Sequence, residues 1–311
     1  MPPTLPKDLD LAAEEDGIRL VNLVLMINLF TDKPLSELGA SAIQTFERYR
    51  QIVGEDALRF YATATMQKHA AVTRRALTML DTWLAPKAKR PDLLVLEIHD
   101  GANYNDAPAS TAYAIHGREE YKGERDSDAT LVRISLPYAW GFEPEKTLAL
   151  TEELWALAPW RSGQVGFAFE TSRYLPEPAQ EHAYRRSMRH PGIDIAYTVN
   201  DAIMAGFDRV RRVGWLTLID DAFVKQLGGL AELKKAVGPS VTVRKSGPGV
   251  VLQAGDHPEF GDVNRKDKLP AYRAVHKALR PLMMDPSDAP SLDIGGDFEG
   301  RTEAWLQRFE K

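Results

Sequence analysis

The sequence contains no cysteine among its 311 residues. Disulfide bonds, thiolate catalysis and cysteine-ligated metal sites are therefore excluded, and a reducing compartment is expected, so we predict a cytoplasmic protein. No apolar segment follows a basic start, which predicts that there is no signal peptide. The apolar stretch from Leu20 to Phe30 is too short to span a bilayer and contains Asn22 and Asn28, so we expect no membrane partner.

The chain also lacks an excess of basic residues. Its 39 Lys and Arg against 44 Asp and Glu give a net charge of -5 at pH 7, which argues against nucleic acid as a direct partner. The same charge leaves room for a basic protein partner. Hydrophobic residues at 44% and charged residues at 27% are ordinary globular values, and the length allows one large domain or two modest ones. These values leave the oligomeric state open.

Catalytic and cofactor motifs are missing as well. The seven histidines do not show the His-x-x-x-His spacing of a zinc site. Carboxylates at Asp220 and Asp221, or between Asp256 and Asp262, could serve acid–base chemistry or magnesium, but helix capping and turn formation explain them more simply. We therefore predict that the protein is not an enzyme and has no catalytic, cofactor-binding or metal-ligating residues.

The pair His99 and Asp100 is the best candidate for chemistry. It stands at the end of a predicted strand, before the most polar loop of the chain, and a histidine beside an aspartate can act as a base or bind a metal. Turn formation explains Asp100-Gly101 equally well, and adjacent residues of a strand point to opposite faces. A metal-dependent hydrolase that uses His99 and Asp100 remains the alternative function.

The order of predicted elements indicates an α+β fold of mostly antiparallel sheet with helices packed on one face. Two related α/β subdomains are a second arrangement, and Pro86–Pro91 is a candidate boundary. We expect a flexible N-terminal arm over residues 1–16 and the folded domain over residues 17–311. Strands are predicted at 18–30 (central, buried on both faces), 58–62, 92–98, 110–116, 129–136, 163–169, 214–219, 240–244 and 249–253. Helices are predicted at 34–54, 72–84, 144–158, 172–189, 197–212, 221–228, 230–237, 270–279 and 305–309, with Asp220 and Asp221 at the N-cap position of the sixth.

Several sequence runs resemble the type VI immunity family of Gram-negative bacteria. In chain order they are Arg133–Pro137, the glycine-bearing strand at Gly163, Arg189–Asp194, Gly214–Leu218, Gly249–Gly255, Gly261–Arg265 and Leu269–Tyr272. The resemblance implies an antitoxin that binds a cognate type VI secretion effector, often a nuclease, and blocks it by occluding its active site. It implies a binding protein. A structural subunit of a secretion apparatus is a separate, third hypothesis.

Under this resemblance, the partner is expected to bind loops that vary over a rigid sheet. The candidate loops are residues 100–106, 119–128 and 256–262. Exposed carboxylates in such loops can occupy the basic, phosphate-binding cleft of a nuclease. The predicted partner-binding residues are Asp100, Asn103, Tyr104, Asp106, Asp256, Glu259 and Asp262.

Overall fold

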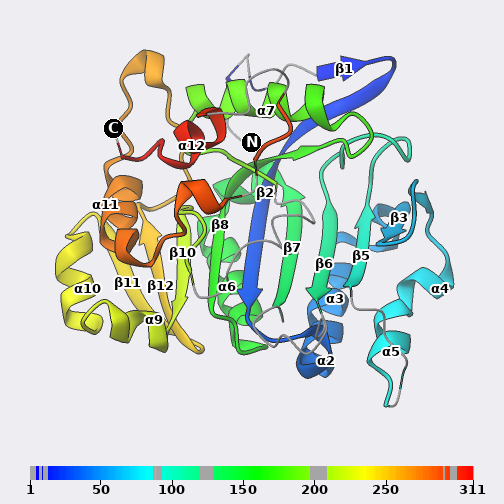
Figure 1. The fold of residues 1–311 in the computed structure, drawn as a ribbon, viewed down its shortest axis with the longest axis horizontal. Coiled ribbons are helices and arrows are strands. Elements are labelled where there is room, and N and C mark those ends of the chain that lie inside the picture. The colour runs from blue at the N-terminus through cyan, green and yellow to red at the C-terminus, as the bar shows by residue number, and fades with distance from the viewer. Residues whose placement is uncertain are drawn as a thin grey trace.

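One open sheet organises the chain (Figure 1). The computed structural model describes residues 5–6, 9, 13–86, 88, 93–118, 129–196, 209–289, 291–294 and 300–310. Its strands are β1 (Ala13–Glu15), β2 (Ile18–Thr31), β3 (Phe60–Thr63), β4 (Ala70–Ala71), β5 (Leu93–His99), β6 (Ala112–Arg118), β7 (Ala129–Pro137), β8 (Ser162–Thr171), β9 (Asp194–Ile195), β10 (Leu216–Asp220), β11 (Val241–Ser246) and β12 (Gly249–Ala254). They follow the order β11-β12-β10-β8-β2-β7-β6-β5-β3-β4, with β1 beside β2 and β9 beside β8.

The predicted α+β class is confirmed, because these strands pair antiparallel except for the short parallel pair β8–β9. The prediction of a central strand at 18–30 is also confirmed. β2 is 14 residues long, lies between β7 and β8, and is buried over most of its length. Strands on either side of segment 86–91 pair directly, since β3 pairs with β5. Most of that segment lies outside the described residues.

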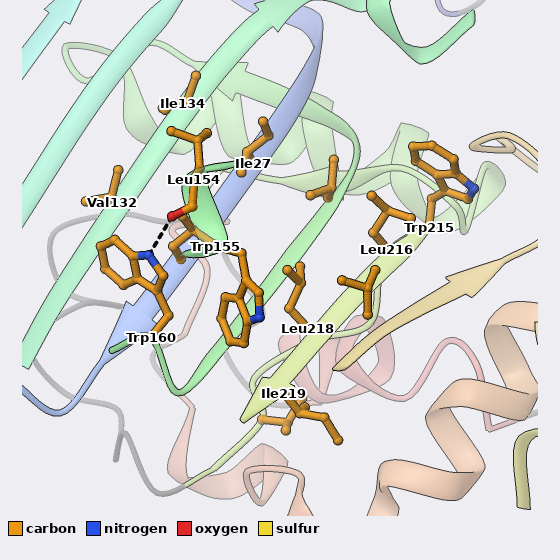
Figure 2. Packing of buried hydrophobic residues seen from close by; sticks show 14 of the residues in the cluster. Ile27, Val132, Ile134, Leu154, Trp155, Trp160, Trp215, Leu216, Leu218 and Ile219 are labelled. Atoms are coloured by element: carbon orange, nitrogen blue, oxygen red, sulfur yellow. Dashed lines mark hydrogen bonds between the residues drawn. The ribbon is translucent and has the colours of Figure 1, made fainter. Parts of the chain in front are cut away.

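The described helices are α2 (Leu35–Leu38), α3 (Ala40–Val53), α4 (Arg74–Leu77), α5 (Met79–Leu84), α6 (Pro144–Ala156), α7 (Pro176–Arg189), α9 (Asp221–Gln226), α10 (Leu230–Val237), α11 (Pro270–Leu279) and α12 (Arg301–Leu306). Helices α3 and α6 cover one face of the central strands. Phe46 of α3 packs against Tyr113 of β6, with ring centroids 4.9 Å apart. Figure 2 shows Leu154 and Trp155 of α6 in the same core as Ile27.

Several local details differ from the predictions. The helix expected at 72–84 is divided at Thr78 into α4 and α5, and the helix expected at 305–309 spans Arg301–Leu306. The helix expected at 34–54 is divided at Gly39, which has a φ of 49°, a region that favours glycine. The helix expected at 172–189 begins only at Pro176, because proline is favoured in the first helical turn. Asp220, and not Asp221, caps α9, since its carboxylate accepts the N–H of Phe223 at 2.8 Å. Residues 209–212 are not helical, and the rest of the helix expected at 197–212 lies outside the described residues.

The N-terminal segment is partly built into the sheet. Residues 13–15 of the expected arm form β1, which pairs with the start of β2. Leu9 is also buried, in a core cluster with Phe169 of β8 and Trp305 of α12. In the part of the chain that the structure describes, no helix is long and apolar enough to cross a membrane.

Candidate partner-binding surface

Two of the three predicted binding loops leave the sheet at the same end. The path from β5 to β12 passes through β6, β7, β2, β8 and β10, and each step is antiparallel. Because the number of steps is even, β5 and β12 run in the same direction. Loops 100–106 and 256–262, which follow these two strands, therefore emerge at the same end of the sheet, with five strands between them. The third predicted loop, 119–128, lies outside the described residues.

Helix α7 links these two loops and lies across the upper end of the sheet in Figure 1. Just before its start, the ring of Tyr174 meets the ring of Tyr104 edge-to-face at 6.1 Å. At its end, Arg189 Nη2 lies 3.3 Å from Asp262 Oδ2, and His190 Nδ1 lies 2.6 Å from the carbonyl oxygen of Gly261. Loop 100–106, α7 and loop 256–262 thus form one continuous surface, called the sheet-end surface below.

Loop 100–106 is held by its own carboxylates. Asp100 accepts hydrogen bonds from the backbone N–H groups of Ala109, Ser110 and Thr111 at 2.8–3.1 Å. Asp106 is buried and accepts the N–H of Arg19 at 3.0 Å and the N–H of Asn103 at 2.8 Å. Of the four predicted residues here, these two carboxylates therefore face inward. Asn103 and Tyr104 are exposed.

Loop 256–262 shows the same division between inward and outward side chains. Asp262 is buried and accepts the N–H of Asn264 at 2.9 Å. The hydrogen bond from Arg189 lowers the pKa of Asp262 below its ordinary value. Asp256 and Glu259 are exposed, and within the described residues neither forms an ion pair. The loop backbone packs closely on the chain after α7, where Gly192 N–H donates to the carbonyl of Phe260 at 2.9 Å.

A cavity of about 600 Å³ opens beside this second loop. Its wall combines aromatic and proline side chains with groups of both charges. The lining residues are Pro6, Phe142, Arg189, His190, His257, Pro258, Glu259, Phe260, Gly261, Asp262, Arg265 and Asp267. Half of these residues belong to the loop, and Arg189 belongs to α7, so the cavity forms part of the sheet-end surface.

The structure does not bring His99 and Asp100 together. His99 is buried, and its Nδ1 accepts the N–H of Gly101 at 3.0 Å, whereas the carboxylate of Asp100 is turned to the loop amides. Burial, together with the nearby His69, lowers the pKa of His99 to about 4. In the described ranges, no group of three or more His, Cys, Asp and Glu residues could hold a metal ion. This geometry gives the hydrolase alternative no support.

A buried polar cluster lies beneath loop 100–106, and the sequence analysis did not predict it. The carboxylate of Glu97 accepts a hydrogen bond from Arg173 Nη1. It also lies 3.0 Å from His116 Nε2 and 3.7 Å from His69 Nε2. Burial alone would raise the pKa of Glu97, but the hydrogen bonds from His116 and His69 and the charge of Arg173 hold it well below its ordinary value. The one signal in the sequence is a carboxylate inside the otherwise apolar run of β5.

Comparison with known proteins identifies the family. The TsiV family model, described as type VI immunity for VRR-NUC, matches residues 41–309. No curated protein matches the chain. Among solved structures, the Pseudomonas aeruginosa T6SS protein PA0821 shares the fold, with a TM-score of 0.78 and 22% sequence identity over 95% of this chain and 83% of that chain. The predicted resemblance is thus confirmed, and the chain belongs to the TsiV family of type VI immunity proteins.

Proposed function

We propose that this protein neutralises a type VI effector nuclease of the VRR-NUC type by binding it with the sheet-end surface and occluding its active site. One structural observation carries the proposal: two loops far apart in the sequence emerge at one end of the sheet and are joined there by α7. A helix of 14 residues is about 21 Å long. That length suits a protein–protein interface of ordinary size, roughly 800 Å² on each partner.

The charges of the second loop suit a nuclease. Exposed Asp256 and Glu259 can face the cationic groups with which a nuclease holds the phosphates of its substrate. We assign to Asp100, Asp106 and Asp262 the role of holding the two loops, because their carboxylates bond to backbone or to Arg189. Preorganised loops lower the entropic cost of association. A chain without cysteine is suited to act in the cytoplasm.

The experiment is a titration of the purified cognate effector with this protein while DNA cleavage is measured. We expect cleavage to stop near one equivalent. The double variant Asp256→Lys and Glu259→Lys should require at least about tenfold more protein, since like charges would then meet across the interface. Asp81→Lys, an exposed change on α5 away from the sheet-end surface, is the control and should inhibit as the natural protein does. Undiminished cleavage with excess natural protein would refute the proposal.

A further inference from the structure

The end of the sheet-end surface near loop 100–106 carries two tyrosines and two arginines. Tyr104 is 40% exposed and is one of only three exposed large hydrophobic side chains in the described part of the chain. Its ring meets that of Tyr174 edge-to-face. Arg59 reaches the same loop, with Nη2 3.5 Å from the carbonyl oxygen of Ala102. Arg173 directly precedes Tyr174. We call Arg59, Tyr104, Arg173 and Tyr174 the tyrosine–arginine patch.

Both guanidinium groups of the patch retain hydrogen-bond donors that face solvent. Arg173 uses Nη1 for the buried Glu97, and its side chain is still 41% exposed. Arg59 is exposed, and within the described residues its guanidinium donates one hydrogen bond, to the carbonyl oxygen of Ala102 at the long limit of 3.5 Å. Among the described residues, Glu97 is the only carboxylate in ion-pair contact with either arginine. Since a guanidinium has five N–H donors, most of them are left for a partner.

The nearest loop carboxylates bond to backbone N–H groups and not to these two guanidinium groups. Asp100 is occupied by three backbone N–H groups, and Asp106 is buried against the N–H groups of Arg19 and Asn103. The outward-facing charged groups of the patch are therefore the guanidinium groups of Arg59 and Arg173, in contrast to the exposed Asp256 and Glu259 at the other end of α7. A partner that covers the whole surface must offer different charges at its two ends.

The patch is also held rigidly. The hydroxyl of Tyr174 accepts the backbone N–H of His69, and its backbone N–H donates to Ser172 Oγ at 3.2 Å. Ser172 Oγ in turn donates to the carbonyl of Asn105 at 2.7 Å, which fixes loop 100–106 to the chain before α7. Tyrosine loses few rotatable bonds on binding, so a tyrosine pair on a fixed backbone gives contact area at low entropic cost.

We propose that the tyrosine–arginine patch anchors the effector and that it binds a carboxylate-bearing part of the effector surface. The inference rests on the proposed function and adds the partner's chemistry at this end. Tyrosine and arginine are the side chains that most often dominate interface energetics. The planar fork of a guanidinium matches a carboxylate in two parallel hydrogen bonds. Phosphates of a nucleic acid would suit the same donors, but the net charge of -5 favours a protein partner.

The test measures the Kd for the purified cognate effector at low and high salt. Tyr104→Ala should weaken binding by about 30-fold or more, as for an interface hot spot, and Tyr104→Phe by less than about threefold because the ring is kept. Arg59→Glu should weaken binding by about tenfold or more and flatten the salt dependence. Lys225→Glu is the matched charge reversal, exposed on α9 at the opposite end of the sheet, and should bind as the natural protein does.

The possible results test the proposed function and the role of the tyrosine–arginine patch separately. Natural protein that fails to bind the effector overturns the proposed function. Natural protein that binds while Tyr104→Ala and Arg59→Glu bind equally well overturns the patch as anchor and leaves the function standing. A DNA duplex serves as a second probe. The natural protein could bind DNA, and Arg59→Glu could abolish that binding while effector binding stays unchanged. This result would show that the patch recognises phosphate and would overturn the carboxylate proposal.

Discussion

Arg189 Nη2, in the last turn of α7, lies 3.3 Å from Asp262 Oδ2. The two residues are 73 positions apart in the sequence, and their contact ties the helix to the loop that follows β12. Asp262 also caps the short turn Val263–Arg265 through the N–H of Asn264. One carboxylate therefore ties the end of loop 256–262 to α7 and to the turn that follows it, and the sheet-end surface depends on it.

Asp262→Asn should loosen this loop, because the amide cannot replace the charge that Arg189 faces. We expect amide hydrogen exchange over residues 256–262 to accelerate by about tenfold, and effector binding to weaken with it. Hydrogen-exchange mass spectrometry measures the first effect directly. Asp256→Asn is the matched control, since Asp256 is exposed and has no ion pair among the described residues. Equal exchange in both variants would contradict the role given to Asp262.

Gly192→Ala should displace the same loop from the other side. A Cβ at this position would lie 1.9 Å from the carbonyl oxygen of Glu259, and a backbone atom cannot move aside without moving the loop. We expect a loss of about 1–3 kcal/mol in the free energy of unfolding, as for other overpacked sites. Denaturant unfolding measures it. At Gly166 the nearest atom would be at an ordinary 3.4 Å, so Gly166→Ala should cost clearly less, and an equal cost would count against this contact.

The buried His99 should make stability depend on pH. Its pKa is lowered from 6.5 to about 4 in the fold, mainly by burial, so the unfolded chain binds the proton more tightly. The neutral His99 therefore contributes fully to the free energy of unfolding above pH 6.5. That contribution, roughly 3 kcal/mol, is lost as the pH falls from about 6.5 to about 4. His99→Gln should flatten the unfolding free energy in that window, measured by urea titration at several pH values. His257→Gln, at an exposed histidine, is the control and should keep the pH dependence of the natural protein. If His99→Gln kept it as well, the role given to His99 would be disproved.

The sequence predicted most elements of this fold because their signals are local. The long β-prone run from Ile18 became the central strand, and Pro270 with buried Tyr272, Val275 and Leu279 became α11. Burial on both faces leaves a strand uniformly apolar, and proline favours the first helical turn. The division at Gly39 escaped prediction because helical spacing continues across it.

The surface could be predicted only in part. The loops were recognisable from turn residues, but their position at the same end of the sheet follows from strand order, which no local pattern reveals. The inward direction of Asp106 and Asp262 depends on Arg19 and Arg189, which are 87 and 73 positions away. The Glu97 cluster likewise joins side chains from β5, β6 and two separate loops. Long-range contacts of this kind leave no spacing in the sequence.

The most direct test of the account is hydrogen exchange of the protein alone and in its complex with the effector. We predict that exchange slows over residues 100–106, 176–189 and 256–262, and that α9 (Asp221–Gln226), at the opposite end of the sheet, is unchanged. Protection confined to α9 and the β11–β12 hairpin turn, with the three segments exchanging as in the free protein, would contradict the assignment of the sheet-end surface.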